Sequence, residues 1–317
     1  MHLWSIYLNF QIANDMCDSQ EILVSVCCAA YNHSAYIRQC LDGFMMQKTN
    51  FRFEVLIHDD ASTDGTQDII REYEMKYPDI IKPIYQTENQ YCKGGKISLR
   101  FNIPRAKGKY IAFCEGDDYW IDPLKLQKQV DFMEENPICN ICSSGYLRKK
   151  GNKIISLELR RSSSGGIWYG LEDINHYWYC KTLTVLFRKE YIQDYSLFIA
   201  KLKFCRDYHF VYYLLKRGKG YYFSEPFGVY NMHAGGVCSL IPLSRKSINR
   251  YNCMKELYFK VGDSVTRIGF FSSIMARIRY KGYTSRKELF CLLGECMSHI
   301  VVAPRYLYNY VRHYIEC

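Results

Sequence analysis

The chain has 317 residues, of which 48% are hydrophobic and 23% charged, and its net charge is +10. This balance is typical of a folded globular protein and excludes a disordered or fibrous chain. No run approaches the eighteen apolar residues of a spanning helix. No signal peptide precedes the fifteen cysteines, so we expect them to be reduced thiols in a cytoplasmic protein.

Residues 1–20 have neither periodicity nor turn chemistry, so we expect an N-terminal extension, with Met16 as a second candidate start. From Ile22 to Pro137 the pattern alternates strand and helix, which is typical of a parallel α/β sheet. Strands are predicted at residues 22–28, 53–57, 80–85 and 110–114, with amphipathic helices after the first, second and fourth.

The next hundred residues are less regular. The sequence predicts a hairpin around Gly151 and Asn152, a helix that opens at Asp207, and strands at 184–187, 221–223 and 228–233. Strand signals end at about residue 240. Residues 241–317 contain 13 Lys and Arg against 5 Asp and Glu. We therefore expect three parts: an extension (1–20), an α/β domain (21–240) and a basic helical C-terminal region (241–317).

Two sets of carboxylates follow two predicted strands. Asp59 and Asp60 end the second, and Glu115, Asp117 and Asp118 follow the fourth. The carboxyl ends of parallel strands meet at one edge of a sheet, which is where open α/β sheets bind ligands. An acidic residue in such a loop is often only a helix cap, but carboxylates this close repel one another unless a cation neutralises them. The pattern predicts a metal and nucleotide site.

Three motifs resemble family 2 glycosyltransferases: Val24-Ser-Val with Tyr31-Asn32, Val55 to Thr66, and Ala112 to Asp118. The resemblance covers about residues 22–240 and implies the GT-A fold, a Rossmann-like α/β fold with a mostly parallel central sheet flanked by helices, here with a C-terminal helical appendage. It further implies a nucleotide-sugar donor, with a UDP-sugar as first expectation, and Mn²⁺ or Mg²⁺ as cofactor. The expected reaction is inverting transfer to a saccharide or lipid-linked acceptor, as in surface polysaccharide synthesis.

The resemblance assigns roles within the acidic motifs. Asp59 resembles the aspartate that pairs with the base, and Asp117 the metal-holding member of the DxD signature. Asp118 is its neighbour on the sugar or water side. Glu115 stands where the family has aspartate, and its longer side chain could shift its contact from ribose or metal to water.

Further donor contacts are assigned by the same resemblance to Tyr31 and Asp60 in the first two motifs. Arg100 resembles a basic residue that faces the nucleotide phosphates; the alternative is a solvated arginine on an amphipathic helix. His233 resembles a histidine in a loop over the diphosphate, and the glycines after it would let such a loop close.

Inverting transfer also needs a general base that takes the proton of the acceptor hydroxyl. Asp207 resembles the acidic residue at the head of the helix beside the acceptor, and a helix start favours an ionised carboxylate. We prefer Asp207 over Asp173, Asp194 and Glu225; the alternative role of Asp207 is a helix N-cap.

One alternative stays open at this point, and two others are disfavoured. The chain could be a nucleotide-sugar-binding or assembly protein with little or no turnover, an option that Glu115 keeps open. A nucleotidyltransferase would need a glycine-rich loop after the first strand, which Ala29 to His33 does not provide. Nucleic acid is not expected as a partner, because the positive charge is concentrated outside the predicted site.

The C-terminal segment combines basic and apolar residues in a helical pattern. A basic amphipathic helix can lie on the cytoplasmic face of a membrane, as a peripheral protein would, or pack on the rest of the chain. The residues concerned are Arg267, Arg277, Arg279 and Lys281 among Ile268, Phe270, Phe271, Ile274, Met275 and Ile278.

Overall fold

The computed structural model describes residues 21–200, 202–204, 207–236 and 241–300, so the predicted N-terminal extension lies outside it. The chain forms two compact units. The first runs up to Trp168 and adds Cys180–Gln193 and Gly220–Asn231. The second consists of Tyr169–Tyr179, Asp194–Lys219 and the chain from Met232 onward. The division into domains at residue 240 stays a prediction.

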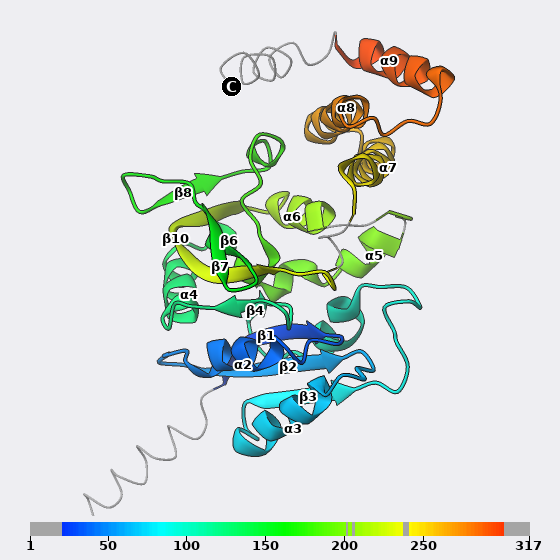
Figure 1. Ribbon diagram of the computed structural model, residues 1–317. Coiled ribbons are helices and arrows are strands. Elements are labelled where there is room, and N and C mark those ends of the chain that lie inside the picture. Colours follow the sequence, from blue (N-terminus) through cyan, green and yellow to red (C-terminus); the bar gives the residue numbers. More distant parts are fainter. Residues whose placement is uncertain (1–20, 201, 205–206, 237–240, 301–317) are drawn as a thin grey trace, which may run out of the picture. The chain divides into compact units, whose positions relative to one another are not determined.

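One mixed sheet organises the first unit (Figure 1). Its parallel part follows the order β3 (Ile81–Tyr85), β2 (Arg52–Asp59), β1 (Ile22–Ala30) and β4 (Tyr110–Phe113). Beyond β4 the order continues with β9 (Leu186–Arg188), β6 (Cys139–Lys150), β10 (Lys219–Met232) and β5 (Tyr119–Trp120). β9 is antiparallel to β4 and to β6. Two further strands lie off this path: β7 (Lys153–Glu158) pairs with β6, and β8 (Gly166–Tyr169) pairs with β10.

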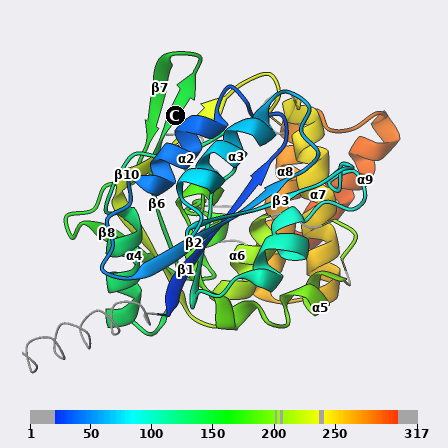
Figure 2. The same cartoon turned by 90° about the horizontal axis from the view of Figure 1, so that it is seen from below.

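The parallel part is buried on both faces. In β1 five successive residues, 24–28, are buried, as expected for a parallel strand covered on both sides. Helices α2 (Ile37–Met45) and α3 (Thr66–Lys76) lie side by side (Figure 2), and α4 (Lys125–Glu135) follows β5. α2 buries Ile37, Cys40, Leu41 and Phe44, and Met45 is partly buried, so the amphipathic helix predicted after the first strand is confirmed.

The antiparallel part differs from the sequence-based expectation. The two strands predicted at 221–223 and 228–233 form one strand, β10. Gly228, the first residue of the second predicted strand, lies inside β10, where close packing requires a glycine. A Cβ at Gly228 would lie 2.3 Å from the side chain of Leu183 and 3.0 Å from the carbonyl oxygen of Tyr119. β5, which pairs with β10 through Gly228, was not predicted because two residues carry no periodicity.

A lysine without solvent exposure begins α4. Lys125 donates to Gln129 Oε1 at 2.7 Å, and its Nζ lies 4.2 Å from the ring centroid of Trp120. Burial lowers the pKa of Lys125 to about 7. An ordinary lysine of the unfolded chain stays protonated to about pH 10.4. Between these values the unfolded state binds one proton more than the folded state, so Lys125 makes the free energy of unfolding rise with pH.

We expect Lys125→Met to remove this contribution. Relative to the variant, the wild-type protein should gain about 2 kcal/mol of stability from about pH 6.5 to about pH 8.5, measured by urea unfolding. Buried thiols and tyrosines act in the opposite direction at higher pH, but they are present in both proteins and cancel in the difference. Parallel stability profiles of the two proteins would contradict a lysine that is neutral when folded.

The second unit consists largely of helices: α5 (Tyr195–Ala200), α6 (Asp207–Leu215), α7 (Leu243–Val261), α8 (Ser264–Arg279) and α9 (Arg286–Ile300). In α8, Phe270, Phe271 and Ile274 are buried in a core shared with Tyr251 and Leu292. The apolar residues singled out in this helix therefore pack within the unit, which was one of the two sequence-based interpretations. Among the residues described, no helix has the length and apolar character needed to cross a bilayer.

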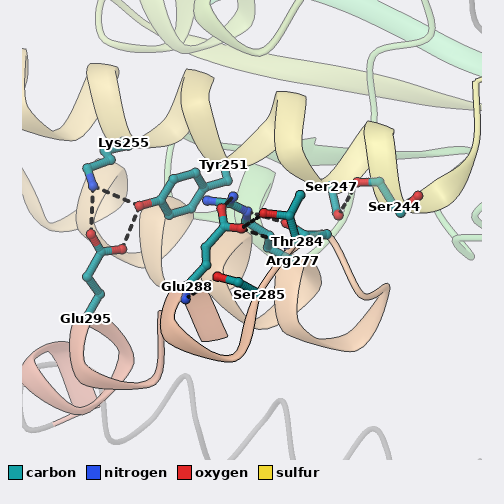
Figure 3. A network of polar contacts seen from close by, with 10 residues as sticks. Ser244, Ser247, Tyr251, Lys255, Arg277, Thr284, Ser285, Glu288 and Glu295 are labelled. Atoms are coloured by element: carbon teal, nitrogen blue, oxygen red, sulfur yellow. Dashed lines mark hydrogen bonds and ion pairs between the residues drawn. The ribbon is translucent and has the colours of Figure 1, made fainter. Parts of the chain in front are cut away.

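Polar contacts join the last three helices (Figure 3). Lys255 of α7 donates to Glu295 of α9 at 2.7 Å, and Tyr251 donates to the same carboxylate at 2.7 Å. Arg277 of α8 forms an ion pair with Glu288 of α9. The basic Arg277 is thus engaged inside the unit.

Candidate functional site

The two acidic motifs lie on either side of the end of β1. The backbone N–H of Asp60 donates to the carbonyl of Ala30 at 2.9 Å, and that of Gly116 donates to the carbonyl of Ala29 at 2.9 Å. Since β2 and β4 both pair in parallel with β1, the predicted convergence of their carboxyl ends at one edge is confirmed.

Asp59 is a buried carboxylate with one oxygen left over. Its Oδ1 accepts the N–H of Ser62 at 3.0 Å and the amide of Gln67 at 2.6 Å. Its Oδ2 is buried and has no hydrogen-bond partner in the structure. Burying an unpaired acceptor costs about 1–3 kcal/mol. A ligand N–H donor would recover this cost, so Asp59 is a ready-made acceptor for such a group.

Asp60 and Arg100 hold one loop. Both oxygens of the Asp60 carboxylate accept backbone N–H groups, from Gln90 at 2.7 Å and from Tyr91 at 3.0 Å. Arg100, in the π-helix Ser98–Asn102, donates to the carbonyl of Gln90 at 3.0 Å. These contacts make both residues supports of the loop that follows β3. Their predicted contacts with a donor stay predictions.

The loops after β1 and β2 are tied to each other. Asn32 donates through its N–H to Ser62 Oγ at 2.9 Å, and Ser34 donates through its N–H to Asp64 Oδ2 at 3.0 Å. Burial would raise the pKa of Asp64, but hydrogen bonds from Thr66 and Ser34 lower it to about 2. Asp64 is therefore a structural anion here. Tyr31, which directly follows β1, lies next to these tied loops in the sequence and is 47% exposed.

The acidic turn after β4 concentrates negative charge in a buried place. Asp118 is 2% exposed, and burial, followed by the charges of Asp117 and Glu115, raises its pKa well above the ordinary range. The Nε2 of His33 lies 3.8 Å from Asp117 Oδ2. A buried carboxylate whose ionised form is disfavoured by two acidic neighbours is a favourable setting for a cation.

Gly116 lets this turn pack against its neighbours. A Cβ at Gly116 would lie 2.9 Å from Ile37 Cδ1 and 3.1 Å from Ala30 Cβ, so any side chain would push the turn outward. Within the ranges that the structure describes, no three His, Cys, Asp or Glu side chains are grouped as a complete ligand set for a metal ion. The turn offers hard oxygen donors of the kind that Mg²⁺ and Mn²⁺ prefer, and it suits an ion that takes its other ligands from a bound molecule and water.

Sequence reasoning missed two residues beside the turn. Asn231 of β10 donates through its N–H to Asp118 Oδ1 at 2.9 Å and through its side chain to the carbonyl of Asp117 at 2.6 Å. Lys181 lies with its Nζ 3.4 Å from the ring centroid of Tyr230, and its charge counteracts the raised pKa of Asp118. Both residues lie more than sixty positions after the acidic turn in the sequence, so no local sequence pattern connects them with the turn.

The remaining predicted residues belong to the second unit. Asp207 is the exposed first residue of α6, and residues 205–206 before it lie outside the described part. His233 directly follows β10, and its carbonyl accepts the N–H of Gly236 at 3.2 Å. Among the alternatives to Asp207, Asp173 accepts the N–H of Gly170 at 2.7 Å, which gives it a structural role.

Comparisons with known proteins agree with this geometry. The model of the family "Glycosyl transferase family 2" matches residues 25–200. An uncharacterized protein of Mycobacterium tuberculosis is 45% identical over 119 residues, which is 38% of this chain and 34% of that protein. The UDP-Glc:alpha-D-GlcNAc-diphosphoundecaprenol beta-1,3-glucosyltransferase WfaP of Escherichia coli is 37% identical over 127 residues, 40% of this chain and 47% of WfaP. The chain thus spans about a third to a half of these relatives.

Solved structures extend the likeness beyond the first part of the chain. TarS 1–349 of S. aureus in complex with UDP-GlcNAc matches with a TM-score of 0.57 and 17% identity, over 82% of this chain and 72% of that one. The mannosyltransferase PcManGT of Pyrobaculum calidifontis, in complex with GDP-Man and Mn²⁺, matches with a TM-score of 0.50 and 14% identity, over 99% and 93%. At these identities the likeness concerns the fold.

Proposed function

Since the chain belongs to glycosyl transferase family 2 and has the GT-A fold, we propose that it transfers a sugar from a nucleotide-sugar donor to a saccharide hydroxyl. The observation that carries the proposal is the pairing of two features at the end of β1. On one side, Asp59 offers a buried oxygen without a partner; on the other, Asp117 and Asp118 offer carboxylates. A nucleoside diphosphate bears complementary groups at its two ends, a base N–H and a charged diphosphate.

We assign the base of the donor to Asp59 and favour a uracil-type base, whose ring N–H would donate to Asp59 Oδ2. The structures of TarS with UDP and UDP-GlcNAc support the choice of a UDP-sugar by fold likeness. Glu115, Tyr31, Asp60, Arg100 and His233 are proposed as further donor contacts. For Asp60 and Arg100 we favour an indirect contribution, through the loop that they support.

A divalent ion, Mn²⁺ or Mg²⁺, is proposed as cofactor, with Asp117 as its protein ligand and Asp118 beside it. Bound there, such an ion supplies positive charge to the phosphate oxygens of the leaving nucleoside diphosphate. The raised pKa of Asp118 beside Asp117 and Glu115 supports this assignment, because a cation would stabilise all three carboxylates. Asn231 keeps Asp118 aimed at this position.

For the acceptor side we propose Asp207 as the general base of an inverting displacement. It would take the proton of the attacking hydroxyl while the sugar–phosphate bond breaks. A lipid-linked saccharide is the acceptor class that we favour, by analogy with WfaP, whose name specifies a diphosphoundecaprenol-linked sugar. This acceptor would bring the protein to the cytoplasmic face of a membrane as a peripheral enzyme.

Donor binding tests the proposal directly. With Mn²⁺ present, UDP-sugars should raise the melting temperature of the purified chain, and GDP-sugars, whose purine base is larger, should raise it less. At ligand concentrations about 100 times Kd the stabilisation is about 2.7 kcal/mol, which is easily measured. Asp59→Ala should abolish most of the shift, because the base loses its charged acceptor.

The control for this experiment is Asp68→Asn, an exposed acid of α3 whose side chain is 85% accessible. Its donor-induced shift should equal that of the wild-type protein. If no nucleotide sugar stabilises the wild-type chain, the proposed function is wrong. If Asp59→Ala keeps the full shift, the base lies elsewhere.

A further inference from the structure

The hairpin formed by β6 and β7 ends in a tight two-residue turn away from the rest of the sheet. In Figure 2 β7 stands out at the upper left of the first unit. Gly151 has a φ of 56°, the left-handed value that the first central position of a type II′ turn requires. Lys150 and Lys153 flank the turn and lie directly opposite each other. The prediction of a hairpin at this position is confirmed.

Large aliphatic side chains are exposed along this hairpin. Ile154, Ile155 and Leu157 are 52%, 49% and 47% exposed. β7 pairs with β6 and with no other strand among those described, so it is an edge strand of the sheet. The pairing register shifts between Arg148 and Lys149, which places two consecutive isoleucines in the exposed part of β7. Edge strands of soluble proteins usually avoid such exposed apolar runs.

The same segment is strongly basic. Arg148, Lys149, Lys150 and Lys153 surround the turn, and Glu158 is the one acid between residues 148 and 161. Arg148 Nη1 lies 3.5 Å from Glu158 Oε1 and forms an ion pair with it. None of the ion pairs in the described part of the chain includes Lys150 or Lys153. Like charges placed directly opposite in an antiparallel pair destabilise the hairpin. An external anionic partner would remove this cost.

Apolar and basic residues together narrow the chemistry of the partner. An acidic glycan or a nucleic acid would satisfy the lysines, but either would leave the isoleucines in water. A bilayer with acidic headgroups satisfies both: the lysines meet the headgroups, and the isoleucines enter the acyl boundary. We propose that the hairpin tip, residues 149–157, docks the protein on an acidic lipid bilayer.

This docking element is separate from the basic helix α8 of the C-terminal region. In α8 the apolar side chains Phe270, Phe271 and Ile274 are buried, and Arg277 is paired with Glu288. The hairpin, in contrast, carries its aliphatic residues and two lysines on the outside. Docking does not depend on turnover, so its test uses no activity measurement and can fail while the proposed function stands.

The test is flotation of the full chain with vesicles. Vesicles contain either phosphatidylcholine alone or phosphatidylcholine with an equal amount of phosphatidylglycerol, at low salt. The wild-type protein should float with the acidic vesicles and remain behind with the neutral ones. Lys150→Gln with Lys153→Gln should lower the vesicle partition coefficient about 30-fold, because each basic residue near an acidic surface contributes about 1 kcal/mol. Ile154→Ser with Ile155→Ser should lower it about tenfold.

The matched control is Met75→Ser with Lys76→Gln on α3, beside β3, which is separated from β6 by β2, β1, β4 and β9 in the strand order. Met75 is 77% exposed, and this variant should bind vesicles like the wild-type protein. Only variants that melt at the same temperature as the wild-type protein are compared. If the isoleucine variant does not fold, the lysine variant still decides the test. Absence of binding to acidic vesicles overturns the proposal, as does equal binding by both hairpin variants. Dimerisation that both hairpin variants abolish, without vesicle binding, would instead identify a second copy of the chain as the partner.

Discussion

Replacing Asp117 with asparagine should lower kcat/KM for sugar transfer by about a thousandfold, since a divalent ion contributes several kcal/mol of charge stabilisation to a leaving diphosphate. Asparagine keeps the shape of the side chain but removes the charge that holds the ion. Melting without metal should be unchanged or occur at a higher temperature, because the charge of Asp117 disfavours the ionised form of Asp118. The variant would then be at least as stable as the wild-type protein but far less active.

Transfer rates across a Mn²⁺ titration, with Asp68→Asn as control, measure this effect. Chelation by EDTA should abolish wild-type activity, and added Mn²⁺ should restore it. If Asp117→Asn retains activity within tenfold of the wild-type protein, Asp117 is not the metal ligand. If EDTA has no effect on the wild-type protein, the reaction does not need the ion at all.

This expected trade-off explains the construction of the turn. Burial of Asp118 and the proximity of three carboxylates cost stability, and they are tolerated where a ligand offsets them. Asn231 holds the turn by two hydrogen bonds, and Gly116 allows it to approach β1.

The parallel part of the fold followed from local patterns in the sequence. The buried strands there are mostly apolar, and α2 has a clear helical period, so β1, β2 and β4 were predicted close to their observed bounds. Their parallel pairing then placed Asp59 and Asp117 at one edge. Strand ends and helix faces are local properties, and local properties can be read from sequence.

The antiparallel part depends on contacts between distant residues. Arg188 was expected to lie beyond the strand predicted at 184–187, yet it is the last residue of β9 and is buried. It is accommodated because it donates to the carbonyl of Cys139 and to the hydroxyl of Tyr110. Asn231 reaches Asp118 across 113 positions of sequence. Such pairings depend on the assembled sheet, so no window of sequence contains them.

The second large effect concerns Asp207. Asp207→Asn should lower kcat for transfer by about 10²–10⁴-fold, the range that a positioned general base contributes. Asparagine is about as favourable as aspartate at the N-terminus of a helix, so α6 should remain folded. Donor binding should survive, because the donor contacts are assigned mainly to the first unit. The UDP-sugar-induced rise in melting temperature should therefore equal that of the wild-type protein.

Asp194→Asn provides the matched control, because Asp194 is an acid of the same unit that was considered for the same role. Retained transfer in Asp207→Asn together with its loss in Asp194→Asn would move the base to Asp194.

A wild-type chain that binds the donor but transfers no sugar to any saccharide acceptor would instead favour a nucleotide-sugar-binding protein without turnover. Loss of the donor-induced shift in Asp207→Asn would mean that Asp207 acts on the donor and not on the acceptor hydroxyl. The combination expected here, intact donor binding with transfer lost, arises only when the missing group takes part in the chemical step or in holding the acceptor.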